Sequence, residues 1–290
     1  MRLKPMDLLM AIIVPLIWGM GFVFAKAAIS HFPPILLMAF RFLLAASVLV
    51  WLAPRPSGNH MRLFGIAVIA AAIQYSMTFT GLRDLSAGVA ALVVQLEVPF
   101  LVLLGVLFLG ERPQAKKWVG IALAFAGVAL IAGDLEMEGH WQALLLVVAG
   151  AFTWSVGQVL IRALKDINGA SVTAWIAIYA TPQLFAMSLI FESGQVTAIR
   201  EATPIVWVAV VYLGLVMTAI GYWLWNSLLR RYEVGMVAPF LLLLPVFSVL
   251  GGFLFLGERL GRSEMLGGAI VIVGVALVTI ERRRKSNSVA

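Results

Sequence analysis

The chain has 290 residues, of which 62% are hydrophobic and 12% charged, and its formal net charge is +7. Its mean hydropathy is +1.01. A soluble domain carries about 25% charged residues, so this composition excludes a water-soluble globular protein. The absence of cysteine excludes disulfides and thiol chemistry.

Ten apolar stretches follow one another along the chain, each close to the ~20 residues that cross a bilayer core as a helix. They cover residues 8–28, 35–53, 63–82, 86–109, 118–133, 141–161, 171–191, 204–229, 235–257 and 264–280. The loops between them are too short for a separate soluble domain. The first stretch ends at Lys26 without an A-x-A cleavage site, so we interpret it as a retained helix. We therefore predict an all-α polytopic membrane protein with ten transmembrane helices.

Basic residues divide unequally between alternate loops. Fifteen Lys and Arg residues lie in the loops and ends on the side of the N-terminus, five lie on the other side, and Arg41 lies inside a helix. The positive-inside rule then places both termini in the cytoplasm, and we expect a bacterial inner-membrane location. Because the basic excess is explained by topology, it does not indicate a nucleic-acid partner.

The six residues LFLGER occur twice, and their glutamates, Glu111 and Glu258, are 147 positions apart. The same offset relates Arg83 to Arg230, while WGMGFVFAKA at Trp18 matches WSVGQVLIRA 136 positions later. We predict two five-helix repeats, residues 1–135 and 136–290. Because five is odd, the repeats would lie in opposite orientations, an arrangement typical of secondary transporters.

The sequence resembles the EamA-type transporters of the drug/metabolite transporter superfamily. The resemblance covers nearly the whole chain and rests on these motifs: Trp18-Gly19, Phe32-Pro33-Pro34, Arg41-Phe42, Ser86-Ala87-Gly88, Leu109-Gly110-Glu111-Arg112, Trp154, GYWLW from Gly221, Arg231-Tyr232-Glu233, Val237-Ala238-Pro239 and the second Gly-Glu-Arg from Gly257. It implies export of amino acids, their metabolites or other small organic solutes. Partly on this resemblance, we expect the third, fourth, sixth, eighth and ninth helices to form the cavity.

Glu97 is an acidic residue that lies well inside a predicted span. Inserting a carboxylate at this depth costs about 2.5–3.5 kcal/mol on insertion scales. Polar groups at this depth usually face a cavity or a partner. We interpret Glu97 as a proton-coupling site or a contact for a substrate ammonium group. The alternatives are a buried partner for Arg41 and a permanently neutral acid.

Prolines interrupt the fourth and ninth spans. Proline removes a helical hydrogen bond, so Pro99 leaves the carbonyl of Gln95 free, and Pro239 and Pro245 act similarly in the ninth span. Paired interruptions in repeat-related helices indicate a substrate site at mid-depth. Kinked packing alone is the other explanation.

The remaining candidates are polar or aromatic side chains inside spans. The predicted cavity residues are Gln74, Tyr75, Gln95, Glu97, Trp154, Gln158, Tyr179, Tyr222, Trp223 and Asn226. Arg41 could contact a substrate carboxylate, although a structural pair or snorkelling would also explain it. Gly120 and Gly127, like Gly267 and Gly274, are seven apart and predict close helix packing, with a dimer seam as one use.

Other functions lack their motifs. No G-x-x-x-x-G-K-[ST] or H-E-x-x-H string occurs, and the three histidines fall in predicted loops. We expect no catalytic residues, metal site or cofactor.

The predicted function is export of amino acids or their derivatives by alternating access, either proton-coupled or as a passive facilitator. An intramembrane enzyme or a non-transporting receptor fits less well. The predicted partners are the lipid bilayer, a small-molecule substrate and, in the coupled case, protons; the protein could be a monomer or a homodimer.

Overall fold

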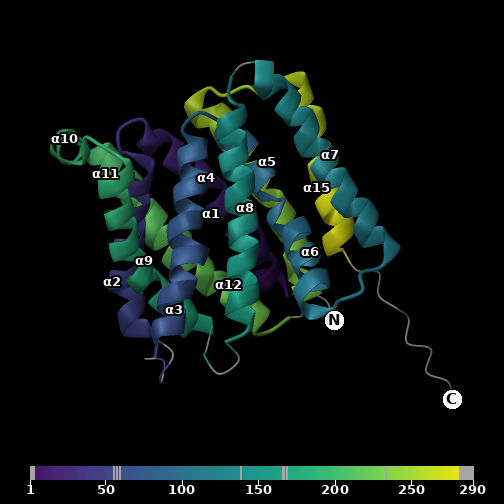
Figure 1. The fold of residues 1–290 in the computed structure, drawn as a ribbon, viewed down its shortest axis with the longest axis horizontal. Coiled ribbons are helices and arrows are strands. Elements are labelled where there is room, and N and C mark those ends of the chain that lie inside the picture. Colours follow the sequence, from purple (N-terminus) through teal and green to yellow (C-terminus); the bar gives the residue numbers. More distant parts are fainter. Residues whose placement is uncertain are drawn as a thin grey trace.

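The computed structural model describes residues 4–54, 56, 58, 60–137, 139–164, 167, 169–232 and 234–280. Within this part of the chain all secondary structure is helical, and ten helices are long and apolar enough to cross a membrane. This confirms the predicted all-α membrane fold. The spans stand side by side as a bundle (Figure 1).

The first half contains five spans. They are α1 (Pro5–Ile29); α2 (Pro34–Leu52); α3 (His60–Ala67), η1 (Val68–Ile73) and α4 (Gln74–Leu82) in series; α5 (Ala87–Val94) followed by α6 (Glu97–Leu109); and α7 (Ala115–Met137). Each boundary falls within a few residues of the apolar stretch that predicted it.

The second half contains five more. They are α8 (Trp141–Arg162); α9 (Gly169–Phe191); α11 (Pro204–Val211), η2 (Tyr212–Ile220) and α12 (Gly221–Leu229) in series; α13 (Val234–Val237), η3 (Ala238–Leu242), α14 (Leu243–Gly251) and η4 (Gly252–Leu256) in series; and α15 (Arg262–Thr279). A short helix, α10 (Gln195–Glu201), lies between the seventh and eighth spans.

The third and eighth spans each contain a π-helical stretch, η1 and η2, that apolar periodicity did not predict. In η2 the hydroxyl of Thr218 donates to the carbonyl of Leu213, 2.8 Å away and five residues earlier. Such stretches often mark functional sites, and here each ends directly before the helix that carries a cavity tyrosine.

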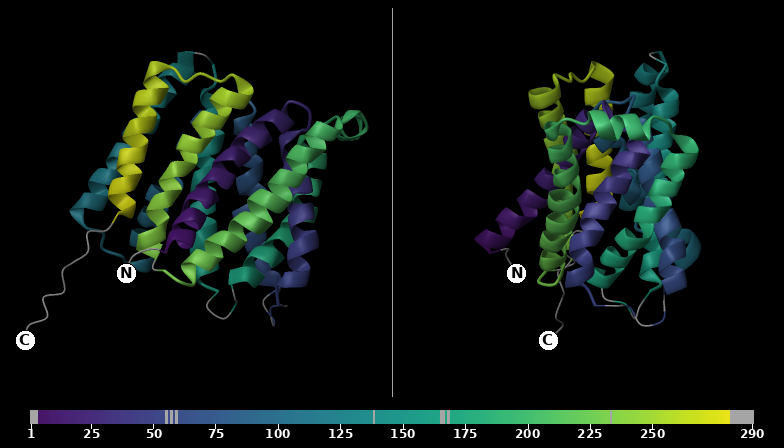
Figure 2. Two further views of the ribbon diagram at one scale, coloured as in Figure 1. Left: turned by 180° about the vertical axis from the view of Figure 1, so that it is seen from behind. Right: turned by 90° about the vertical axis from the view of Figure 1, so that its left-hand side faces the viewer.

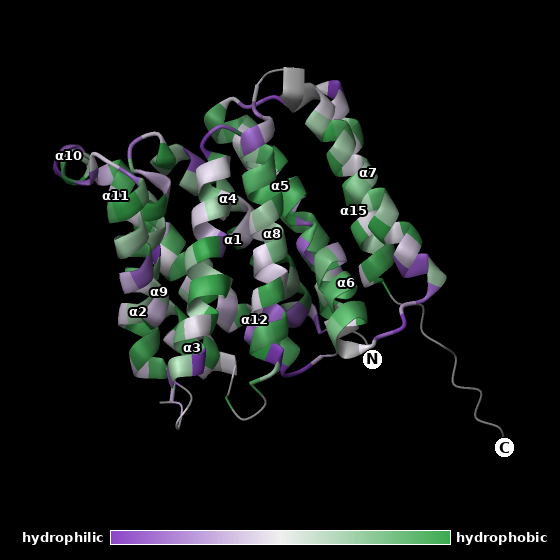
Figure 3. Ribbon diagram, viewed as in Figure 1, coloured by the Kyte–Doolittle hydropathy of each residue, from purple (hydrophilic) through white to green (hydrophobic). Residues whose placement is uncertain are grey.

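The start of α1 and the last described residue, Ile280, lie on the same side of the bundle (Figure 2). We call this side the chain-end face and the opposite side the distal face. Apolar residues cover the helices between the two faces, and hydrophilic residues gather at helix ends and in loops (Figure 3). The apolar side chains of Phe108 and Phe255 are about 70% exposed, as expected of residues that contact lipid.

Both LFLGER motifs end a helix in the same way. Gly110 and Gly257 adopt left-handed backbone, with φ of 65° and 68°. The amide of Glu111 then donates to the carbonyl of Gly105 at 3.2 Å, and that of Glu258 to Gly252 at 3.1 Å. A left-handed glycine with such a bond closes a helix C-terminus, so both motifs mark the end of a span.

Helices related by sequence offsets of about 136 and 147 make several equivalent contacts. The helix α7 packs on α15, and α2 packs on α9. The contact of α4 with α8 corresponds to that of α12 with α1, and the contact of α6 with α8 corresponds to that of α14 with α1.

The predicted close-packing glycines lie between α7 and α15. A Cβ on Gly120 would stand 2.6 Å from the carbonyl oxygen of Gly274, and one on Gly127 would stand 2.6 Å from that of Gly267. These glycine faces therefore pack within one chain, and a dimer seam would have to use other surfaces.

Candidate substrate cavity

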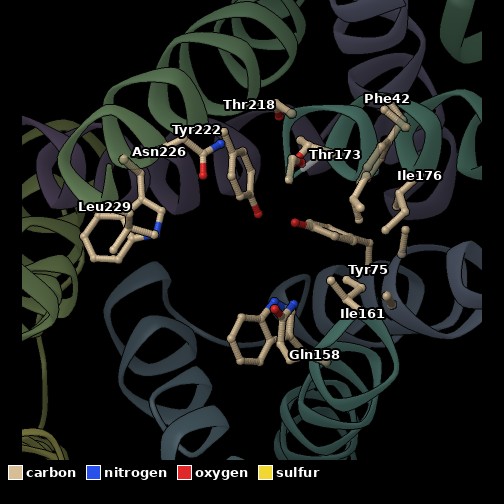
Figure 4. Close-up of a pocket in the computed structure, with 17 residues that line it drawn as sticks. Phe42, Tyr75, Gln158, Ile161, Thr173, Ile176, Thr218, Tyr222, Asn226 and Leu229 are labelled. Carbon is tan, nitrogen blue, oxygen red and sulfur yellow. The ribbon is translucent and has the colours of Figure 1, made fainter. Parts of the chain in front are cut away.

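A cavity of about 270 Å³ lies inside the bundle. Its walls come from α2, η1, α4, α8, α9, η2 and α12: Phe42, Ala70, Ala71, Tyr75, Trp154, Gln158, Ile161, Gly169, Val172, Thr173, Ile176, Ala177, Thr218, Tyr222, Trp225, Asn226 and Leu229. Small-molecule sites are usually such mostly apolar clefts with a few polar groups, from ~300 Å³ upward. Figure 4 shows the polar groups directed into the space.

The cavity reaches from mid-depth to the chain-end face. Gly169 is the first residue of α9, and Leu229 is the last residue of α12, so both lie at that face. Tyr75 and Thr218 line the deep end. Solute could therefore enter this cavity from the side on which the chain begins and ends.

Tyr75 on α4 and Tyr222 on α12 point toward one another across the deep end, hydroxyl group to hydroxyl group (Figure 4). The two residues are 147 positions apart. The repeat therefore places equivalent tyrosines on opposite walls of one cavity.

Arg41 lies behind this tyrosine pair and is 1% exposed. Its Nε donates to the hydroxyl of Thr218 at 3.0 Å, and its guanidinium carbon is 4.6 Å from the centre of the Tyr75 ring. No carboxylate of a described residue pairs with it. A buried cation without a counter-ion is costly unless something compensates its charge, and here neutral oxygens, the Met38 sulfur and aromatic faces surround it.

Glu97 is the first residue of α6 and is partly exposed. Its backbone carbonyl accepts a hydrogen bond from the Ser155 hydroxyl at 2.9 Å, whereas no described residue bonds its carboxylate. It does not pair with Arg41, which excludes that alternative in this conformation. Ser155 is the neighbour of the cavity residue Trp154 in α8, so Glu97 lies beside the lining and not in it.

The fourth and ninth spans, which contain the prolines, both depart from regular α-helix where they contact each other. The fourth span breaks at Gln95 and Leu96, between α5 and α6, and Pro99 lies in the first turn after the break. Pro239 lies in the 3₁₀ helix η3, and Pro245 follows in the first turn of α14. The Gln95 amide donates to the carbonyl of Leu241 at 3.5 Å, which is the carbonyl that Pro245 leaves free within its helix.

Five predicted cavity residues line the cavity: Tyr75, Trp154, Gln158, Tyr222 and Asn226. The others lie elsewhere. Gln74 is buried and bonds the Thr78 hydroxyl at 3.1 Å, Tyr179 contacts His60 Nδ1 at 2.7 Å, and Trp223 is 63% exposed on the outside of the bundle. Gln95 and Glu97 lie in the fourth span, which does not contribute to the lining. A role for them in transport stays a prediction.

Some lining residues were not predicted. Thr218 is a polar residue inside the eighth span, and this signal was available in the sequence. Phe42, Ile176 and Leu229 are apolar residues in apolar helices, so nothing local distinguishes them from core or lipid-facing residues. Their position follows from how the helices pack. The second and seventh spans were accordingly missing from the expected set, and the fourth and ninth do not contribute.

A bundle of ten membrane-crossing helices that encloses a cavity is an architecture typical of membrane transporters. The profile of the EamA-like transporter family matches residues 6–133 and 141–280. The chain belongs to this family.

Similar proteins carry related names. The chain is 32% identical over 280 residues, 93% of each chain, to a "Probable amino-acid metabolite efflux pump" of Escherichia coli K12. It is 31% identical over 214 residues to a "Probable terminal-alkyne amino-acid exporter" of Streptantibioticus cattleyicolor, covering 70% of this chain and 68% of that one. A crystal structure with 21% identity superposes with a TM-score of 0.67 over 97% of this chain and 100% of that one, which shows the shared fold.

Proposed function

We propose that this protein exports amino acids or their derivatives across the bacterial inner membrane by alternating access. The observation that carries the proposal is Arg41, a buried cation directly behind the lining residues Tyr75 and Thr218 that no described carboxylate neutralises. A substrate carboxylate would supply the missing negative charge. The names of the relatives support the same class of substrate.

The cavity offers complementary groups for the rest of an amino acid. Glu97, whose backbone bonds Ser155 next to the lining residue Trp154, would attract an ammonium group. Trp154, Ile176 and Leu229 provide apolar wall for a side chain. Gln158 and Asn226, both partly buried, can bond polar substituents of amino-acid derivatives.

The excess of basic residues on the chain-end side, fifteen against five, supports cytoplasmic termini. The cavity would then open to the cytoplasm, where an exporter loads its substrate. The equivalent contacts of helices about 136 and 147 residues apart support two inverted repeats, 1–135 and 136–290. One repeat would rock against the other to open the distal face.

Proton coupling would use Glu97, whose carboxylate has no bonded partner among the described residues. In this mechanism Glu97 exchanges its proton between the two sides of the membrane. A passive facilitator would use the same cavity without that exchange, and the pH dependence of transport distinguishes the two.

Counterflow in proteoliposomes tests the function. Vesicles preloaded with an unlabelled amino acid should accumulate the labelled form, and empty vesicles should not. A set of amino acids and their acetylated and esterified derivatives identifies the preferred class. If no member of the set exchanges, and none raises the melting temperature of the purified protein, the proposed substrate class is wrong.

A further inference from the structure

The repeat relates two pairs of charged residues at opposite faces. The offset of 136 takes Lys26, near the end of α1, to Arg162 at the end of α8, and the offset of 147 takes Glu258 to Glu111. Lys26 and Glu258 lie at the distal face, whereas Arg162 and Glu111 lie at the chain-end face. Their contacts differ.

At the distal face, Lys26 and Glu258 hold facing helices together. The Lys26 Nζ donates to the carbonyls of Leu82 and Arg83 at 3.1 and 2.7 Å, at the end of α4. Both carboxylate oxygens of Glu258 accept from the amide of Ala87 at 3.0 Å, at the start of α5. The pair therefore fixes the turn between α4 and α5 from both sides, in the partly buried setting where charge-assisted bonds are strong.

The space behind the distal pair is filled. Phe22 and Phe79 stack with their ring centroids 6.0 Å apart, and both are buried. Their repeat counterparts are Gln158 and Asn226, which line the open cavity. The closed distal half and the open chain-end half are thus built from equivalent positions.

At the chain-end face, the equivalent charges bind each other instead. Arg162 Nη1 is 3.0 Å from Glu111 Oε1, and the side chains are 69% and 46% exposed. Both residues line a crevice of about 380 Å³ beside the cavity. The carbonyls equivalent to those that Lys26 binds belong to Leu229 and Arg230, and Arg162 bonds neither of them in this structure.

We propose that Lys26 is a latch that holds the distal face closed, and that Arg162 is the counterpart latch for the chain-end face. When the chain-end face closes, Arg162 donates to the carbonyls of Leu229 and Arg230. Glu111 then accepts from the first amides of α13, as Glu258 does from α5. This inference rests on the alternating access of the proposed function and assigns its two gates.

The absence of cysteine allows single-cysteine reporters. Ala25→Cys, the distal reporter, places a thiol at a fully buried site whose counterpart, Ile161, lines the cavity. In this background, Lys26→Met should raise the rate at which a membrane-impermeant maleimide added on the distal side labels the thiol. The increase should be about tenfold or more, which corresponds to a loss of ~1.4 kcal/mol in the stability of the closed distal face. Lys26→Arg should restore slow labelling, because it keeps the cation.

The counterpart latch predicts the opposite result. Arg162→Met removes a bond formed only when the chain-end face is closed, so the thiol of Ile161→Cys should be labelled faster from the chain-end side. The distal reporter should be labelled no faster from the distal side. Arg83→Gln and Arg230→Gln are matched controls, since each removes a cation at the same turn and leaves the carbonyl acceptor. Both should label like the parent.

Melting temperature checks that each variant is folded, and Glu258→Gln gives a second way to weaken the distal latch. The latch is overturned if the distal reporter in folded Lys26→Met and Glu258→Gln is labelled as slowly as in the parent. It is also overturned if Arg83→Gln is labelled as fast as Lys26→Met. Labelling requires no substrate. If the reporters are labelled as predicted but the protein transports no amino acid, the latch stands and the proposed substrate class is wrong. If the protein transports amino acids but labelling of the distal reporter does not change, only the latch is wrong.

Discussion

Tyr75 and Tyr222 occupy equivalent positions in the two halves of the chain and face each other across the deep end of one cavity (Figure 4). In the proposed alternating access, a pair at this position would stay beside the solute whichever face is open. Arg41 is buried against the ring of Tyr75, behind the cavity wall. The arrangement places two hydroxyl groups at the wall of a space the size of a small metabolite, with a buried cation behind one of them.

The tyrosine hydroxyls should contribute to transport in both orientations. Tyr222→Phe and Tyr75→Phe keep ring packing and remove one hydroxyl each, so each should lower the rate of counterflow by severalfold without lowering the melting temperature by more than a few degrees. Tyr75→Leu should also destabilise the protein, because it removes a cation–π contact of ~0.5–2 kcal/mol with Arg41. Equal melting of Tyr75→Leu and Tyr75→Phe would contradict the cation–π contact.

Arg41→Met should separate stability from function. It removes a buried charge that no described carboxylate compensates, so the melting temperature should stay the same or rise. Counterflow of amino acids should fall at least about tenfold, since a charge-assisted bond of ~1.5–3 kcal/mol is lost. Arg41→Lys, which keeps the charge but cannot match the planar guanidinium, should retain partial activity. A structural role for Arg41 predicts the reverse: a strongly lowered melting temperature and unchanged affinity in the folded fraction.

Glu97→Gln should leave the protein folded and abolish the dependence of transport on a pH gradient, because glutamine fills the same space without a proton to exchange. The measurement is flux into proteoliposomes with and without an imposed gradient. Glu201→Gln, at the exposed end of α10, is a control that removes a carboxylate and keeps Glu97. If wild-type flux ignores the gradient and Glu97→Gln changes nothing, the protein is a passive facilitator.

The glycine contacts between α7 and α15 predict a sharp difference between two substitutions in one helix. Gly127→Ala puts a methyl group against the backbone of Gly267 and should lower stability by about 1–3 kcal/mol. Gly133→Ala, with open space around its Cα, should be neutral or slightly stabilising. Thermal melting in detergent compares the two. Similar melting temperatures would show that the helices are not in close contact at Gly127.

The membrane fold was predictable because apolar length and basic asymmetry are strong local signals, as the boundaries of α1 and α8 illustrate. The two inverted repeats stay a prediction, which rests on the occurrence of LFLGER in both halves of the sequence. The π-helical stretches and the 3₁₀ helix η3 were not, since their geometry depends on contacts such as the bond from Arg41 to Thr218.

The site was predictable only in part. Tyr75, Gln158 and Asn226 attracted attention as polar groups in apolar helices, and they do line the cavity. Trp223 met the same criterion but lies on the outside, because one position along a helix turns a side chain by ~100°. The apolar wall residues Phe42 and Leu229 had no local signal, since a lining residue and a core residue look alike until the helices are packed.

Recognition of a carboxylate at Arg41 is the central claim, and competition between matched solutes tests it most directly. Counterflow of a transported amino acid should be inhibited by other amino acids and at least about tenfold less by the corresponding amines that lack the carboxylate. In Arg41→Met this discrimination should disappear. Equal inhibition by acid and amine in the wild-type protein would contradict the account.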